Sequence, residues 1–279
     1  MLESTFAQIR EWTGANVIGI FDPDSVITGV SSDTRQIKNG DIFVALRGMN
    51  HDGHKFLAEA FRLGAVAAIV ENDCVVSSEL GPIFFVESPL RALGEIARQH
   101  RSKFQIPVVC ITGSSGKTTT KEMVASVLEN RFNVLKSRGS ENNEIGVPNT
   151  LLKLNAAHEV VVLELAARRQ GDIEYLCSIA QPTFGILLNI GSAHLEYFES
   201  LEGVAKAKGE LLEYLDESLI ALINADDRVV CQEVQRTKGR LLTFGFQSES
   251  IFRGEGLILD QESCGHFLFR GFEIDLGIP

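Results

Sequence analysis

The sequence has few cysteines, and none of them form a recognisable motif. Its five cysteines are scattered, odd in number and never spaced as Cys-x-x-Cys. Zinc sites and disulfide frameworks need closely spaced or evenly numbered cysteines, so neither is expected here. Scattered thiols of this kind are typical of a reducing cytosol. The cysteines are Cys74, Cys110, Cys177, Cys231 and Cys264.

Long hydrophobic segments are also missing. No apolar run approaches the roughly 20 residues that a membrane-spanning helix needs. The N-terminus, from Met1 to Thr5, lacks the basic start and the apolar centre of a signal peptide. We therefore predict a cytoplasmic protein that does not insert into a membrane.

Positive charge is scarce. The 279 residues include 26 Lys and Arg against 37 Asp and Glu, which gives a formal net charge of −11. Proteins that bind nucleic acids or anionic membranes present a basic surface, so no nucleic-acid partner is expected. A small anionic ligand is still compatible with this balance, because a single loop can supply a local positive field.

The most informative stretch is PVVCITGSSGKTTT at residues 107–120. An apolar β-branched run, a glycine-flanked loop and a helix-compatible segment follow one another, which is how proteins cradle phosphate. Gly113 and Gly116 allow backbone N–H groups to face an anion. Lys117 can reach the β- and γ-phosphates, and the Thr118 hydroxyl can bind Mg²⁺.

This loop departs from the strict P-loop spacing in one respect. The strict pattern has a glycine five positions before Gly116, where this chain has Ile111. A plain strand-to-helix turn is the alternative interpretation. It leaves the Lys-Thr-Thr at the start of the helix unexplained, so we predict phosphate binding.

The order of expected elements indicates two domains. Short strands and one clear helix are expected before residue 87, and Ser88-Pro89 has the form of a helix start. We place the boundary there, with one domain at 1–87 and a second at 88–279. From Val108 onward strands and helices alternate, which predicts a parallel sheet with helices on both faces. Strands are predicted at 41–46, 66–70, 83–86, 108–112, 133–135, 160–165, 183–190, 218–224 and 241–246. Helices are predicted at 55–63, 90–101, 117–129, 171–180, 203–215 and 227–236, and another is predicted to start at about residue 147. A β-hairpin is predicted after Ile251.

Polar side chains follow two of these strands. Glu164 comes directly after the apolar residues 160–163, while Asn189 lies at the end of the next predicted strand and His194 follows that strand. The carboxyl ends of parallel strands meet at one edge of a sheet, where α/β proteins bind ligands. Taken singly, Glu164 is equally compatible with a helix cap, and His194 with a structural histidine. Together, beside a phosphate loop, they predict a functional site in which Glu164 binds Mg²⁺.

Two other segments are unusually polar. The stretch RGSENNEIG carries Asn142 and Asn143 between glycines, where a bland connection would suffice. The stretch AKAKGE carries Lys206 and Lys208 within a predicted helix. A charge run on a helix is usually a solvated face, and this is the default interpretation of the two lysines.

With these motifs the chain resembles the Mur ligases of peptidoglycan synthesis, which are ATP-dependent enzymes that form amide bonds. The resemblance covers essentially the whole chain. TGSSGKTT at 112–119 is similar to the phosphate loop of the family, and SDTR at 32–35, GDIFVAL at 40–46 and DGH at 52–54 are similar to its uridine-nucleotide domain. NNEIGVP at 142–148, AHLE at 193–196 and AKGE at 207–210 are most similar to the branch that joins D-alanyl-D-alanine to UDP-N-acetylmuramoyl-tripeptide.

The resemblance implies an α/β protein with a small UDP-sugar-binding N-terminal domain, followed by an ATP-binding P-loop domain with a parallel sheet. The chain stops before the C-terminal domain of the family, so we expect that domain to be absent and the chain alone to be inactive. The implied cofactors are ATP and Mg²⁺. UDP-N-acetylmuramoyl-tripeptide and D-alanyl-D-alanine are the implied substrates, an acyl phosphate is the implied intermediate, and we expect a monomer.

The resemblance also implies roles for single residues. Thr118 and Glu164 match ligands of the ATP-linked Mg²⁺, while His194 and Lys208 match ligands of a second Mg²⁺, the lysine as a carbamate. The catalytic residues implied are Lys117, His194 and Lys208. The residues implied in nucleotide binding are Gly113, Ser114, Ser115, Gly116, Lys117, Thr118, Thr119, Asn142, Asn143 and Asn189. The residues implied in substrate binding are Thr34, Arg35, Asp52, Gly53 and His54.

Three other functions stay open at this point. The chain could be a truncated relative that binds a UDP-sugar or a nucleotide without ligation. It could be a ligase of the same family that adds a single amino acid. A small-molecule kinase or GTPase would keep the phosphate loop, but it would leave the N-terminal domain and the segment 142–148 unexplained.

Overall fold

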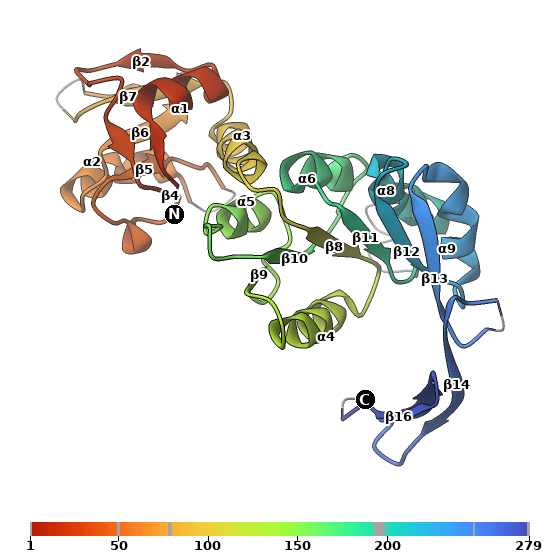
Figure 1. Ribbon diagram of the computed structural model, residues 1–279. Coiled ribbons are helices and arrows are strands. Elements are labelled where there is room, and N and C mark those ends of the chain that lie inside the picture. The colour runs from red at the N-terminus through yellow and green to blue at the C-terminus, as the bar shows by residue number, and fades with distance from the viewer. Residues whose placement is uncertain are drawn as a thin grey trace. The chain divides into compact units, whose positions relative to one another are not determined.

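The structure is a computed structural model that describes residues 2–48, 51–77, 80–191, 198, 200–247 and 249–277. Contacts divide the chain into two compact units, whose elements are labelled in Figure 1. The predicted domain boundary at residue 88 stays a prediction, because these units follow contacts and each takes in several stretches of chain. The first unit comprises Met1–Ile106, Leu128–Val161 and Ser178–Gln181, and the second comprises Pro107–Val127, Val162–Cys177 and Pro182–Pro279.

The elements that start in the first unit are β1 (Ser4–Thr5), α1 (Phe6–Thr13), β2 (Asn16–Ile18), β3 (Val26–Ile27), β4 (Gly29–Ser31), η1 (Thr34–Gln36), β5 (Asp41–Val44), η2 (Gly53–Phe56), α2 (Leu57–Arg62), β6 (Ala67–Glu71), β7 (Ile83–Val86), α3 (Pro89–Ser102), β9 (Val134–Lys136), α5 (Gly146–Leu151) and β10 (Val160–Glu164). Five strands form a sheet with the order β2-β7-β6-β5-β4. All neighbours are parallel except β2, which runs antiparallel to β7. The sequence predicts one helix before residue 87, and the structure adds a second, α1, which starts in a capping box between Thr5 and Gln8.

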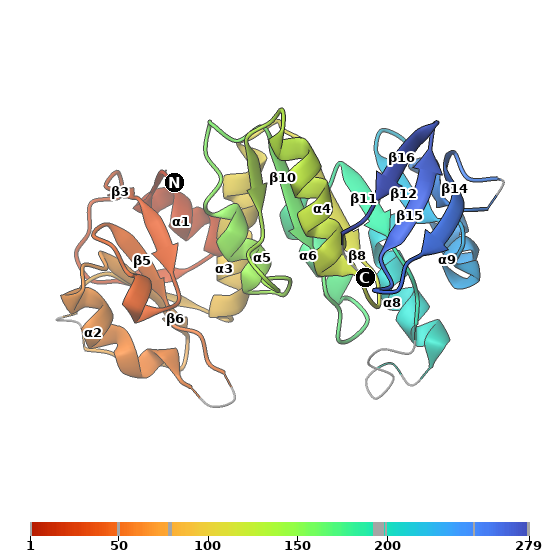
Figure 2. The ribbon, with the colours of Figure 1, turned by 90° about the horizontal axis from the view of Figure 1, so that it is seen from below.

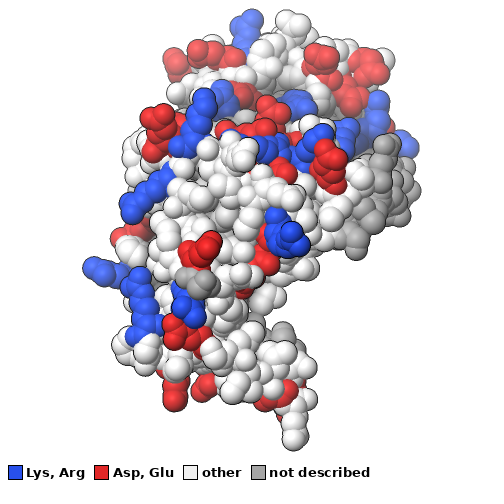
Figure 3. Space-filling model, turned by 90° about the vertical axis from the view of Figure 1, so that its right-hand side faces the viewer, with Lys and Arg blue, Asp and Glu red and all other residues white. Residues whose placement is uncertain are grey.

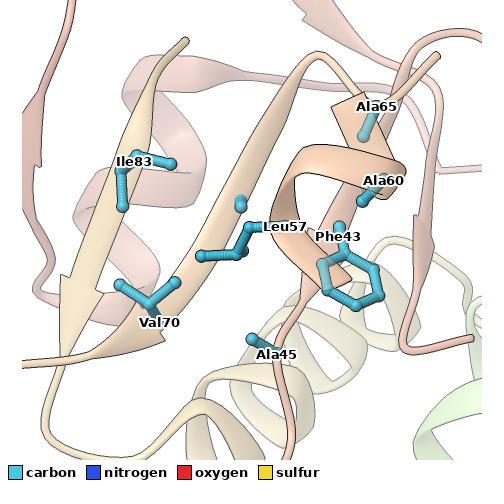
Figure 4. Packing of buried hydrophobic residues seen from close by; sticks show 8 residues of the cluster. Phe43, Ala45, Leu57, Ala60, Ala65, Val70 and Ile83 are labelled. Carbon is cyan, nitrogen blue, oxygen red and sulfur yellow. The ribbon is translucent and has the colours of Figure 1, made fainter. Parts of the chain in front are cut away.

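One hydrophobic cluster of this unit lies between its sheet and α2 (Figure 4). Phe43 comes from β5 and Val70 from β6, and both side chains are buried. Leu57 and Ala60 are three residues apart in α2, so they share the face that packs on the sheet. Burying a large apolar side chain of this kind contributes about 1.5–3 kcal/mol, which makes this packing a principal source of stability for the unit.

The helix α3 begins as the sequence predicts. The Ser88 hydroxyl accepts a hydrogen bond from the Arg91 N–H, and Pro89 occupies the first turn. Near the end of the helix, the buried guanidinium of Arg101 holds the segment that leads into the next strand, because a buried charge of this kind needs acceptors. It donates to the carbonyl oxygens of Phe104, Ile106, Ala180 and Gln181.

The remaining elements are β8 (Val108–Thr112), α4 (Lys117–Glu129), α6 (Asp172–Ala180), β11 (Phe184–Leu187), α8 (Leu201–Tyr214), β12 (Ile220–Asn224), α9 (Arg228–Glu233), η3 (Val234–Arg236), β13 (Arg240–Gly245), β14 (Phe252–Leu259), β15 (Gly265–Phe269) and β16 (Phe272–Asp275). The large sheet has the strand order β16-β15-β14-β13-β12-β11-β8-β10-β9. The pairs from β8 through β11, β12 and β13 to β14 are parallel. Helix α4 covers one face, and α6 and α8 cover the other (Figures 1 and 2). The predicted parallel sheet with helices on both faces is confirmed.

Two details differ from the sequence prediction. Strand β11 ends at Leu187 rather than at 190, because the residues after it turn toward the loop that follows β8 and hydrogen-bond to it. The predicted hairpin is confirmed as β14 and β15, and a short third strand, β16, pairs antiparallel with β15. Four residues flanked by turns give too weak an alternation pattern to predict that strand.

The surface shows no strong separation of charge on the face drawn in Figure 3, where Lys and Arg side chains alternate with Asp and Glu. Among the residues that the structure describes, no helix has the length and apolar character needed to span a bilayer.

The core predicts a difference between two valines of the first unit. Val70 is 0% exposed in β6, whereas Val75 is 98% exposed. Val70→Ala removes two methyl groups from a packed interior, so it should lower the free energy of unfolding by about 2 kcal/mol. Val75→Ala should change it by less than about 0.5 kcal/mol. Urea denaturation followed by circular dichroism measures both, and equal midpoints for the two variants would contradict the packing described.

Candidate functional site

The loop between β8 and α4 has the form that the sequence predicts. Gly113 lies so close to β11 that a Cβ atom there would be 3.0 Å from Cβ of Leu188. Gly116 has a φ of +74°, a conformation that L side chains rarely adopt. A side chain at Gly113 would thus press on Leu188, and one at Gly116 would strain the backbone. The loop leads directly into α4, whose first N–H groups have no partner within the helix and can face an anion.

Lys117 crosses back over this loop. Its Nζ donates to the carbonyl oxygen of Gly113 at 2.9 Å and to that of Ser114 at 3.4 Å. Burial lowers the pKa of Lys117, and the negative charge of Glu164 acts in the opposite direction. A half-buried cation among backbone amides is a strong feature for binding phosphate.

The carboxylate that ends β10 meets the loop on its other side. Glu164 is only 2% exposed, and it accepts a hydrogen bond from the Thr118 hydroxyl at 2.7 Å. A hydroxyl and a carboxylate are hard oxygen ligands of the kind that Mg²⁺ prefers. Across the described ranges, no cluster of three or more His, Cys, Asp or Glu could hold a metal by itself. The pair therefore fits an ion that phosphate oxygens would complete.

Lys208 corrects the default interpretation of the basic helix. Lys206 is exposed and lies 3.2 Å from Glu202, as a solvated face would require. Lys208 is instead 2% exposed, so the solvated-face interpretation is wrong for it. Two residues along a helix change direction by about 200°, which takes Lys208 to the buried face of α8. Burial, and then the positive charge of Lys117, lower the pKa of Lys208 to about 8.

Asn189 reaches the same loop from the end of β11. Its side-chain oxygen accepts hydrogen bonds from the N–H groups of Ser114 and Ser115, at 3.0 and 2.9 Å. The structure thus brings Lys117, Thr118, Glu164 and Asn189 together, as strand order predicts for one edge of a parallel sheet. His194, which the sequence also places here, lies outside the described residues.

Sequence-predicted substrate residues lie in the first unit. Thr34 and Arg35 form η1, where Asp33 caps the backbone and holds the Arg35 guanidinium at 2.6 Å. The Arg35 side chain is 86% exposed. It lines a cavity of about 750 Å³ together with Lys38 and Lys153. Exposed cations around a polar cavity can bind an anionic ligand.

Asp52, Gly53 and His54 have local structural contacts. The His54 Nδ1 lies 2.7 Å from Asp52, and its Nε2 accepts a hydrogen bond from the Glu71 N–H. A Cβ atom on Gly53 would lie 2.8 Å from the backbone nitrogen of Leu46, so only glycine fits there. These contacts shape the segment, and substrate binding by it stays a prediction.

Asn142 and Asn143 belong to the first unit, ahead of α5. The Asn143 side-chain oxygen accepts hydrogen bonds from the N–H groups of Ile145 and Gly146, which fixes the turn into the helix. Their predicted approach to phosphate is not tested by these contacts.

Two carboxylates near the site have roles that the sequence interpretation did not assign. Asp227 caps α9 with one oxygen and accepts the Ile190 N–H with the other, at 3.0 Å. Glu210 is buried in α8 and accepts the N–H groups of Gly171 and Glu174 at the start of α6. The position of Asp227, an acidic residue between a strand and a helix, is a sequence signal for its role as a helix cap. No local pattern identifies the role of Glu210, because its partners are more than 35 residues away.

Two protein-family models match this chain, each over a different range of residues. The model described as "Mur ligase middle domain" matches residues 111–279. The model described as "Mur ligase family, catalytic domain" matches residues 26–101.

Individual relatives agree with the family models. A UDP-N-acetylmuramoyl-tripeptide–D-alanyl-D-alanine ligase from Synechocystis sp. is 40% identical over 241 residues, covering 85% of this chain and 53% of the relative. The enzyme of the same name from Bacillus subtilis is 31% identical over 279 residues, covering 100% of this chain and 60% of the relative. The chain thus spans about half the length of the curated relatives it matches.

Solved structures give the same result. MurF from Acinetobacter baumannii superposes with a TM-score of 0.90 at 29% identity, covering 100% of this chain and 61% of that one. MurF from Thermotoga maritima in complex with ADP superposes with a TM-score of 0.78 at 37% identity, covering 88% and 57%.

The buried position of Lys208 predicts an unusual titration. With a pKa of about 8, its amine is half neutral near that pH, where a lysine at the ordinary value of 10.5 stays charged. Lysine-selective NMR should show one signal with this midpoint, and that signal should be lost in Lys208→Met. Lys117→Met removes a neighbouring positive charge, so it should raise the midpoint of Lys208. A Lys208 signal that titrates at the ordinary value would contradict the burial.

Proposed function

This chain belongs to the Mur ligase family, and we propose that it binds ATP at the loop Gly113–Thr119 to activate a carboxylate for amide formation. The proposed substrates are UDP-N-acetylmuramoyl-tripeptide and D-alanyl-D-alanine, as in the names of the relatives. Those names favour a dipeptide over a single amino acid as the amine substrate. The ADP complex of the Thermotoga maritima relative supports nucleotide binding.

The observation that carries this proposal is the arrangement of three side chains around one loop. Lys117 lies over the loop backbone, and the Thr118 hydroxyl contacts Glu164 at 2.7 Å. This arrangement supplies a cation for phosphate and two oxygen ligands for a metal ion. Thr118 and Glu164 would hold Mg²⁺, which when bound offsets the negative charge of the phosphates.

The proposed reaction has two steps. A carboxylate oxygen of the tripeptide attacks the γ-phosphorus of ATP, the bond to ADP breaks, and an acyl phosphate forms. The amine of D-alanyl-D-alanine then attacks the acyl carbon, phosphate leaves, and the amine nitrogen loses a proton. The first step brings two anions together, so it needs a fixed positive charge at the site. Lys117 is proposed to supply it.

The other predicted residues are proposed to assist. Lys208 is proposed to become a carbamate, for which its low pKa is favourable because only a neutral amine reacts with CO₂. His194 is proposed to lie near a second Mg²⁺. Asn142 and Asn143 are proposed to approach the phosphates. The residues proposed for the uridine nucleotide are Thr34, Arg35, Asp52, Gly53 and His54.

The first test concerns the phosphate loop. Lys117→Ala should weaken the binding of Mg-ATP by about tenfold to a hundredfold, because it removes a charged hydrogen-bond donor. Lys206→Ala is the matched control, since it removes an exposed lysine and should leave the affinity unchanged. Isothermal titration of the three proteins measures the effect. Equal affinities for the parent and Lys117→Ala would refute nucleotide binding at this loop.

The second test concerns the first unit. Arg35→Ala should weaken the binding of UDP by about tenfold, because a guanidinium is well suited to phosphate oxygens. Arg62→Ala removes another exposed arginine of the same unit and serves as the control. Fluorescence competition with a labelled UDP derivative would report both. If Arg62→Ala and Arg35→Ala bind UDP alike, the uridine nucleotide is not held by η1.

A further inference from the structure

We propose that Asn189 is a positioning residue, which holds the first half of the phosphate loop so that the second half stays open to phosphate. The proposal rests on the proposed function of this loop, and it assigns a role to a side chain that bonds the loop itself. Ser114 and Ser115 form the held half, and Gly116 to Thr119 form the half left for the anion.

The carboxamide of Asn189 matches the loop with both of its polar atoms. Its oxygen accepts from the Ser114 N–H at 3.0 Å, the Ser115 N–H at 2.9 Å and the Ser115 hydroxyl at 3.3 Å. Its nitrogen donates to the Ser115 carbonyl oxygen at 3.1 Å. Only a side chain with an acceptor and a donor on one planar group makes this set of bonds, so an amide is required.

Further contacts bind the same half of the loop to the end of β11. The Asn189 carbonyl oxygen also accepts the Ser114 N–H, at 3.0 Å. The Ser114 hydroxyl bonds both backbone groups of Gly191, donating at 3.2 Å and accepting at 2.8 Å. The N–H groups of Ser114 and Ser115 are thus already used, and the anion is left with those that begin α4.

The direction of the carbonyl groups matters as much as that of the N–H groups, because a carbonyl oxygen that faces phosphate repels it. Lys117 holds the carbonyls of Gly113 and Ser114, and Asn189 holds that of Ser115. The Lys117 ammonium has three N–H donors, so a phosphate can take the third and compete with the carbonyls for the other two. Asn189 bonds the loop with both of its polar atoms, so it can keep the loop in shape when the lysine turns to phosphate.

Asn189 is itself held from behind. Asp227 accepts the N–H of the next residue, Ile190, at 3.0 Å, while its second oxygen caps α9. This bond connects the end of β11 to the start of a helix, which makes a firm support for the loop.

Asn224 ends the neighbouring strand β12, and its side-chain oxygen accepts a hydrogen bond from the Asp226 N–H. Among the described residues, its side chain makes no hydrogen bond to the phosphate loop. Asn224 is therefore a matched asparagine that can serve as a control.

The test uses the whole 279-residue chain and three variants. Asn189→Ala removes every side-chain bond to the loop. Asn189→Asp keeps the acceptor for the two N–H groups but loses the donor to Ser115 and adds a negative charge. Asn224→Ala is the control. Mg-tripolyphosphate is the main probe, since it reports the phosphate loop without a base, and UDP is titrated in parallel as a probe of the first unit.

Asn189→Ala should weaken tripolyphosphate binding by about tenfold or more, with loss of amide-exchange protection at Ser114 and Ser115. Asn189→Asp should keep that protection and still bind more weakly, which tests the proposal even if the alanine variant folds poorly. UDP affinity should be unchanged in both, and Asn224→Ala should behave like the parent. Unchanged tripolyphosphate affinity in Asn189→Ala, or in Asn189→Asp, would overturn the proposal.

The outcome is separable from that of the proposed function. If the parent chain binds no phosphate, or if Lys117→Ala binds it equally well, the function proposed for the loop fails. If the parent binds and Lys117→Ala does not, but Asn189→Ala binds like the parent, only the positioning role of Asn189 fails.

Discussion

The candidate site depends on one constraint, which is that the end of β11 lies directly against the loop that follows β8. The two strands are paired in parallel with Leu187 opposite Thr112, so the segments that follow them leave the sheet at the same level. A side chain at Gly113 would press on Leu188. The bonds of the loop to Asn189 follow from this register, while Glu164 reaches the loop from β10, the neighbour of β8 on its other side.

Electrostatics then explain why such a site suits an anion in a protein with a net charge of −11. Lys117 is half-buried and Lys208 is buried, and the positive charge of Lys117 lowers the pKa of Lys208. Two such cations repel each other and lose hydration, which costs stability. The negative charges of a bound polyphosphate would offset both the repulsion between the two lysines and their lost hydration. Glu164 offsets part of the cost, and its bond to Thr118 places it where a metal ion would take over that role.

The sequence predicted the parts of this site that are determined locally. The strand, the glycine loop, Lys117 and Thr118 are contiguous, and the continuous apolar run at 160–163 was enough to place Glu164 at the same edge. The sequence also placed Asn189 at this edge, but it could not predict the bonds of its side chain to Ser114 across 75 residues. The burial of Lys208 depends on packing around α8 that charge alone does not reveal. The sequence also offers little indication of α1. This helix is short, and its start depends on a capping box rather than on a long apolar pattern.

The short sequence Lys208-Gly209-Glu210 shows how closely one helix can be constrained. Lys208 is buried beside the charge of Lys117, and Glu210 is buried where it caps the start of α6. Between them, a Cβ atom on Gly209 would lie 2.1 Å from a guanidinium nitrogen of Arg236. That guanidinium is held by ion pairs, so it cannot yield without breaking them. Lys208 is thus buried beside another positive charge, Gly209 faces a guanidinium held by ion pairs, and Glu210 is bonded to the start of α6. Three different neighbours therefore constrain three successive residues of α8.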